Sequence, residues 1–200
     1  MFPAKVLGLS VAIMGVALAR VRASHPFPSF GPANATTTVR AVLTAIVCSC
    51  IGEPHTAAIA IAIVTAATAA TILDGVDGWL ARRTRMASAF GARFDMEIDA
   101  LLILALSVLA WRHGKAGAWI LASGLLRYVF VAAGWIAPWL ARPLAPTLRA
   151  RAICVTQIVI LLVVMLPTIV PDVSAPLAAA GVLVLLYSFA VDTLWLWRHR

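Results

Sequence analysis

The sequence predicts an all-α, polytopic membrane protein, and three observations support this fold class. Hydrophobic residues make up 62% of the 200 residues and charged residues only 12%, whereas about a quarter of the residues in a soluble domain are charged. Apolar runs recur along most of the chain, each close to the roughly 20 residues that a bilayer-spanning helix needs. The basic residues lie in short segments between these runs, as expected of cytoplasmic loops.

We expect two parts, an N-terminal segment over residues 1–30 and one membrane domain over residues 31–200. The apolar core of the first part, residues 6–19, is short for a span and has the length of the hydrophobic region of a signal peptide. The sequence leaves open whether this segment is an extra span, a helix in the membrane interface or a cleaved leader. Pro28 and Pro32 then break any helix, because proline lacks a backbone donor.

Six core spans are expected, over residues 35–51, 56–73, 90–111, 116–136, 152–169 and 176–196. Asn34 is a suitable N-cap for the first span, and Gly52-Glu53-Pro54 ends it. The second span is built from Ala, Ile, Val and Thr, whose small side chains permit close helix contacts. The third begins inside an acidic stretch, and turns or Pro-rich loops at 112–115, 138–146 and 171–172 separate the remaining spans.

The basic residues of the connections are distributed unevenly between the two sides of the membrane. One side holds arginines at positions 82, 83, 85, 93, 142, 149, 151, 198 and 200, and the other holds Arg112 and Lys115. The side richer in arginine is expected to be cytoplasmic. We therefore expect a bacterial inner or plasma membrane protein whose acidic stretch and both core termini face the cytoplasm.

The net charge of +8 does not by itself indicate nucleic-acid binding. The chain has no recognition helix, aromatic-interleaved basic patch or zinc-finger spacing, and its arginines suit anionic lipid headgroups and phosphate substrates. Cys48 and Cys50, with His55 nearby, allow a metal or redox site, but buried small hydrophobic residues explain the cysteines equally well.

Five of the chain's 8 acidic residues lie between positions 74 and 99: Asp74, Asp77, Asp95, Glu97 and Asp99. Asp95 and Asp99 share a helical face with Gly91, and Asp74 and Asp77 can also share one. Four like charges pointing at one volume cannot all stay ionised without cations. Hard divalent ions with oxygen ligands, Mg²⁺ or Mn²⁺, are the natural partners, and a pair of them would support displacement at phosphorus. Helical geometry turns Glu97 away from this face.

Small and basic residues are interleaved with these acids. Arg82 can form charge-assisted bonds to a diphosphate, and Gly78, Ala81 and Gly91 are small where a ligand would approach the backbone. These features indicate metal-assisted phosphoryl transfer. A solvated loop with incidental acids, and a cation transporter with the acids as its transport site, are the alternatives.

The pattern Asp74-x2-Asp77-Gly78-x2-Ala81-Arg82-x8-Gly91-x3-Asp95-x3-Asp99 matches the signature of the CDP-alcohol phosphotransferases (CDP-alcohol phosphatidyltransferases) in every fixed position. Pro32-x-Asn34-x2-Thr37-x2-Arg40 resembles the family's entry into its first span. The family has six spans, and the resemblance covers roughly residues 30–200. An isolated D-x-x-D would be a weak signal, but a pattern with this many fixed positions is a strong one.

The resemblance implies an enzyme that uses a CDP-linked donor, here CDP-diacylglycerol, releases CMP and forms a homodimer. It implies two divalent ions on Asp74, Asp77 and Asp95, with Asp99 as a further ligand and as the general base for the acceptor hydroxyl. The implied CDP-binding residues are Asp74, Gly78, Ala81, Arg82 and Gly91. A rival within the family transfers the phosphoalcohol of a soluble CDP-alcohol to a lipid hydroxyl.

The acceptor is expected to contact basic residues outside the motif. Arg127 lies near the middle of a predicted span, where an ionisable residue suggests function, and Arg149 and Arg151 lie at the mouth of the next span. The three have no acidic partner nearby in sequence, which favours a phosphorylated polyol such as glycerol 3-phosphate or inositol phosphate. Alternatively, Arg127 is structural and the other two anchor the helix. Arg40 either reaches the headgroups or faces the active site.

Overall fold

The computed structural model describes residues 8, 31–84, 88–142, 144 and 147–199, and the expected segment over residues 1–30 therefore lies almost entirely outside the described residues. The described residues form six α-helices and two short 3₁₀ helices, without strands. The all-α class is thus confirmed for this part of the chain. By internal packing the chain divides into two compact units, residues 1–105 and 106–200.

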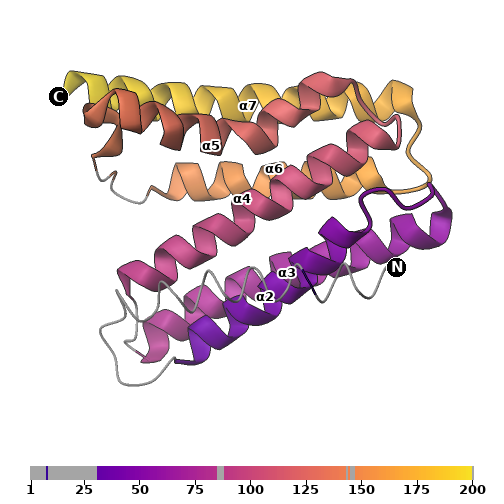
Figure 1. Cartoon of the computed structure of the whole chain (residues 1–200), viewed down its shortest axis with the longest axis horizontal. Coiled ribbons are helices and arrows are strands. Elements are labelled where there is room, and N and C mark those ends of the chain that lie inside the picture. Colours follow the sequence, from indigo (N-terminus) through magenta and orange to yellow (C-terminus); the bar gives the residue numbers. More distant parts are fainter. Residues whose placement is uncertain (1–7, 9–30, 85–87, 143, 145–146, 200) are drawn as a thin grey trace. The chain divides into compact units, whose positions relative to one another are not determined.

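The first unit contains α2 (Pro32–Ser49), α3 (Ala57–Thr84) and the first part of α4 (Ala89–Arg112). Helix α2 runs alongside α3 (Figure 1). Pro32 suits the first turn of α2, because its missing donor would be unsatisfied there anyway. Ser88 caps α4, since its Oγ accepts the Gly91 backbone N–H at 3.0 Å.

The second helix continues well beyond its expected end. Its predicted span stopped at residue 73, but α3 extends to Thr84, so that Asp74 and Asp77 lie inside the helix. No proline interrupts this stretch, and glycines at 75 and 78 weaken a helix without ending it. The extension holds the two aspartates on a regular helical face.

The second unit contains the end of α4, η1 (Ala118–Ile120), α5 (Leu121–Ile136), η2 (Pro138–Ala141), α6 (Leu148–Met165) and α7 (Pro171–Arg198). Helix α6 begins four residues before the expected position 152, because Thr147 caps it by accepting the Ala150 N–H at 3.2 Å. Buried Lys115 donates to the carbonyl oxygens of Leu166 and Ile169, at 2.9 and 2.5 Å, just after the end of α6.

Among the described residues, four helical segments are long and apolar enough to cross a membrane: Ala57–Leu80, Ala118–Ile136, Leu148–Met165 and Pro171–Arg198. Their length and composition indicate an integral, polytopic membrane protein. Helices α2 and α4 are not in this set. Helix α4 has four charged residues in its first half, and α2 has a buried polar face that includes Asn34, Thr37 and Arg40.

Candidate active site

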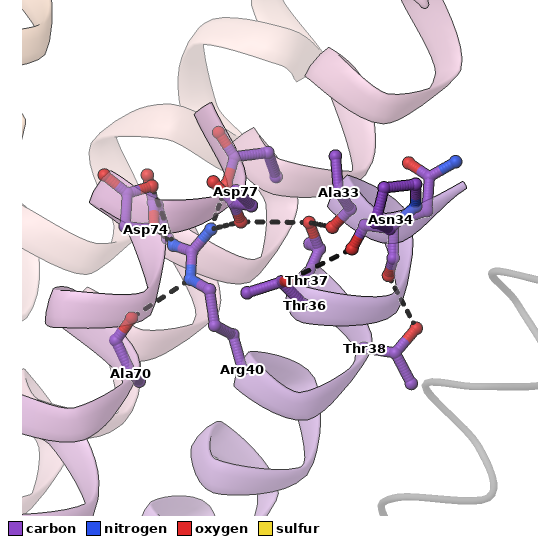
Figure 2. Close-up of polar contacts among 12 residues, drawn as sticks. Ala33, Asn34, Thr36, Thr37, Thr38, Arg40, Ala70, Asp74 and Asp77 are labelled. Atoms are coloured by element: carbon purple, nitrogen blue, oxygen red, sulfur yellow. Dashed lines mark hydrogen bonds and ion pairs between the residues drawn. The ribbon is translucent and has the colours of Figure 1, made fainter. Parts of the chain in front are cut away.

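The guanidinium of Arg40 lies among four carboxylates, those of Asp74, Asp77, Asp95 and Asp99; Figure 2 shows the first two of these. Its Nη2 is 3.0 Å from Asp74 Oδ1, and its Nη1 is 2.8 Å from Asp77 Oδ2. It also forms ion pairs with Asp95 and Asp99. Only 1% of Arg40 is exposed. The four aspartates that the sequence predicted to converge are therefore brought together, around an arginine.

Helical spacing explains how three helices build this cluster. Asp74 and Asp77 of α3 are three residues apart, and Asp95 and Asp99 of α4 are four apart, so that each pair shares a face. An apolar cluster holds α2 against α4 beside the charges, and it consists of Ala41, Phe90, Phe94 and Ile98. The two phenylalanine rings stack with centroids 5.8 Å apart. Apolar packing thus fixes the helices that carry the charges.

Asp77 has a more closed environment than the other three acids. The Thr37 hydroxyl donates to its Oδ2 at 3.0 Å, and Arg40 donates to the same oxygen at 2.8 Å (Figure 2). Only 4% of Asp77 is exposed. Thr37 and Arg40 are three residues apart on α2, which therefore supplies both partners of this carboxylate.

Asp74, Asp95 and Asp99 have the geometry of a metal-binding set. Each can offer one carboxylate oxygen such that the three atoms lie within 4.8 Å of one another. Carboxylate oxygens are the preferred ligands of hard divalent ions such as Mg²⁺ and Mn²⁺. The guanidinium of Arg40 pairs with the same three carboxylates, which shows independently that their surroundings favour positive charge. The residues therefore fit a divalent metal, with Asp77 beside the set rather than in it.

The structure describes the side-chain surroundings of some of the remaining motif residues but not of others. Gly78 is half-buried on α3, and Glu97 is exposed and does not belong to the set of Asp74, Asp95 and Asp99. An alanine Cβ at Gly91 would lie 3.0 Å from Asn34 Oδ1, so that the site is already narrow there. Ala81 and Arg82 belong to α3, but their side chains lie outside the described part of the chain. The diphosphate contact of Arg82 stays a prediction.

The three arginines expected to bind the acceptor all lie in the second unit. Arg127 is half-buried on α5 and Arg151 is exposed on α6. Arg149 pairs with Asp192 of α7 and donates to the Ser188 carbonyl at 3.4 Å. The absence of an acidic partner nearby in sequence was thus misleading for Arg149, because its partner lies 43 residues further along the chain.

Arg40 and Thr37 are the site residues that the sequence did not assign. The sequence left Arg40 between the headgroups and the active site, and the structure places it at the centre of the aspartates. The available signal was a polar stripe, with Asn34, Thr37 and Arg40 at three-residue intervals, and Arg40 is the one charged residue of this helix. The alternative site of Cys48, Cys50 and His55 is not formed, because the aspartate set is the only such ligand group among the described residues.

The fold and the site together are those of a membrane protein with an aspartate cluster, Asp74, Asp77, Asp95 and Asp99, around a buried arginine. The chain matches the family model of the CDP-alcohol phosphatidyltransferases over residues 30–192, and it belongs to this family. It is therefore a transferase of substituted phosphate groups, of the EC 2.7.8 type, in phospholipid biosynthesis. No curated protein and no solved structure matches the chain in the corresponding comparisons.

Proposed function

We propose that the protein transfers the phosphatidyl group of CDP-diacylglycerol to a hydroxyl acceptor and releases CMP. The observation that carries this proposal is the convergence of Asp74, Asp95 and Asp99 on one cation-binding volume. Membership of the family supplies the CDP-linked donor. The apolar helices support a lipid-linked donor, because they keep the enzyme in the membrane where such a donor resides.

In this proposal, the four aspartates hold two divalent ions, Mg²⁺ or Mn²⁺. When bound, the ions supply charge neutralisation for the attacking and leaving oxygens at phosphorus. Asp99 accepts the proton of the acceptor hydroxyl as that oxygen bonds to the β-phosphorus, and the bond from this phosphorus to the CMP oxygen breaks. Arg82 binds the diphosphate, while Asp74, Gly78, Ala81 and Gly91 line the nucleotide site.

We further propose that α2 and α4 complete six core spans within a single domain over residues 31–200. Their charged residues need not face lipid, because those of the cluster pair with one another: Arg40 with the four aspartates. Ionisable residues inside a membrane are usually paired in this way. The arginine-rich connections favour a cytoplasmic site in a bacterial inner or plasma membrane, and the family resemblance favours a homodimer.

A phosphorylated polyol, such as glycerol 3-phosphate or inositol phosphate, is the proposed acceptor. Arg127 and Arg151, both in the second unit, support this choice because arginine binds phosphate. Arg149 would serve only by exchanging its carboxylate partner Asp192 for the phosphate of the acceptor. Phosphate suits such an exchange, because arginine binds both groups through the same fork of donors.

Release of CMP by the purified protein tests the proposal. We expect release from CDP-diacylglycerol with Mg²⁺ or Mn²⁺ and none in EDTA. Asp99→Asn should lower the rate by about 10²–10⁴-fold, as loss of a general base does. Glu97→Gln is the matched control, because this acid lies on the same helix but outside the metal-binding set. Full activity of Asp99→Asn would refute the assignment of the base, and activity in EDTA would refute the metal requirement.

A further inference from the structure

One arginine serves all four carboxylates of the aspartate cluster. Arg40 Nη1 contacts Asp77 and Asp95, and Nη2 contacts Asp74 and Asp99. Its Nε donates to the Ala70 carbonyl at 3.1 Å, which fixes the guanidinium against α3 (Figure 2). The planar donor fork of arginine allows this use of every nitrogen. A single positive charge thus connects the acids of α3 with those of α4.

The charge balance of this arrangement is incomplete. Four carboxylates against one guanidinium leave a formal charge of −3 around a side chain that is 1% exposed. Without Arg40, the acids of α3 and α4 would face one another without the cation that pairs with all four, and like charges at such distances are costly. Arg40 therefore opposes repulsion between the two helices.

The same carboxylates attract the proposed divalent ions. Asp74, Asp95 and Asp99 form the metal-binding set, and each also pairs with Arg40 through its Oδ1. A divalent ion that binds these carboxylates would therefore have to compete with the guanidinium of Arg40. Metal affinity depends on the number of charged ligands in a site. The guanidinium of Arg40 lowers the net negative charge of this site and should therefore lower its affinity for a divalent ion.

We propose that Arg40 is the built-in counter-cation of the aspartate cluster. It is a positioning residue that holds the carboxylates of α3 and α4 together when no divalent ion is bound, and it competes with divalent ions for them. The inference rests on the proposed metal-dependent function. Its test uses stability and metal binding without any CDP-lipid, so that its failure is distinguishable from a failure of CMP release.

The experiment compares the full chain and its Arg40→Gln variant, both purified in detergent. Thermal unfolding is followed in EDTA and in Mn²⁺, and Mn²⁺ binding is titrated by the EPR signal of the free ion. Breaking a buried ion pair leaves an uncompensated buried charge and is strongly destabilising, so the midpoint of Arg40→Gln in EDTA should fall by about 10 °C. Mn²⁺ should restore most of this loss, and its dissociation constant should fall about tenfold, within the usual range of coupling between two ligands.

Three further variants test whether the effect is specific to Arg40 and whether it arises from its positive charge. Arg112→Gln removes an exposed arginine from the end of α4 and should change neither readout. Arg40→Lys keeps the charge without the fork and should lie between the parent and Arg40→Gln in EDTA. Asp77→Asn in the Arg40→Gln background removes one repelling carboxylate and should recover part of the lost stability. If Arg40→Gln cannot be purified, the same comparison is made in the Asp77→Asn background, between the single and the double variant.

Two results would overturn the inference. An unchanged midpoint in EDTA for Arg40→Gln, in the parent chain or in the Asp77→Asn background, would show that the acids do not need Arg40 as a counter-cation. Weaker Mn²⁺ binding by the same variant would show that Arg40 supports the metal-bound state instead of competing with it.

Discussion

Substitution of Gly91 by alanine tests whether the start of α4 leaves space for the nucleotide. The new Cβ would lie 3.0 Å from Asn34 Oδ1 and 3.3 Å from Ser88 Oγ. Asn34 is 6% exposed, and the Ser88 hydroxyl is held by the Gly91 N–H at 3.0 Å. Both neighbours therefore have to move by a few tenths of an ångström to admit a methyl group. We expect Gly91→Ala to impair both packing and access to the site.

The magnitude follows from two opposing effects. Overpacking costs about 1–3 kcal/mol, whereas alanine favours the helix over glycine by about 1 kcal/mol. The net loss of stability should then be about 0–2 kcal/mol. Gly75→Ala is the matched control, because Gly75 lies on α3 with no atom within 4 Å of the added Cβ. It should gain about 1 kcal/mol, and the two variants should therefore differ by about 1–3 kcal/mol.

Thermal unfolding in detergent and the kinetics of CMP release measure the two consequences. The predicted difference in stability corresponds to about 2–4 °C per kcal/mol for a chain of this size. Gly91→Ala should raise the KM for CDP-diacylglycerol about tenfold, the effect of one misplaced methyl group in a pocket, and Gly75→Ala should leave it unchanged. A normal KM for Gly91→Ala would remove Gly91 from the nucleotide site. Equal stability of the two variants would refute the steric argument.

Two more substitutions address the second unit. Arg127→Ala should raise the KM for the acceptor far more than the KM for CDP-diacylglycerol, and equal effects in steady-state kinetics would remove Arg127 from the acceptor site. Lys115→Met should lower the free energy of unfolding by about 3 kcal/mol, because two carbonyls lose a charged donor; a loss of under about 2 °C in the thermal midpoint would contradict this role.

Local spacing made the acidic part of the site predictable. Asp95 and Asp99 are four residues apart, and any regular helix places them on one face. Helical geometry likewise turns Glu97 away from the face of Asp95 and Asp99, and Glu97 is exposed. The end of the second helix was not predicted, because the expected span stopped with the apolar run at residue 73, whereas α3 continues to Thr84. Carboxylates end an apolar run, but they do not end a helix when a cation pairs with them.

The partner of a buried charge was not predictable in the same way. Arg40 is nine residues into α2, within reach of a headgroup along its own helix. Its partners lie 37 and 59 residues away, on two other helices. The pairing of Arg149 with Asp192 has the same long-range character. Spacing along one helix identifies a face, but only the packing of the helices determines which residues meet there.

The contrast between spacing along one helix and contacts between helices also explains why the motif predicts the reaction but not the acceptor. The motif from Asp74 to Asp99 lies on two consecutive helices, so that a linear pattern can record it. The acceptor candidates lie on α5 and α6, and one of them already has a partner on α7. Residues at these positions can change without altering the motif, so the motif alone does not determine the acceptor. A screen of phosphorylated and free polyols for CMP release, with the lipid product identified by mass spectrometry, is the direct way to name the acceptor.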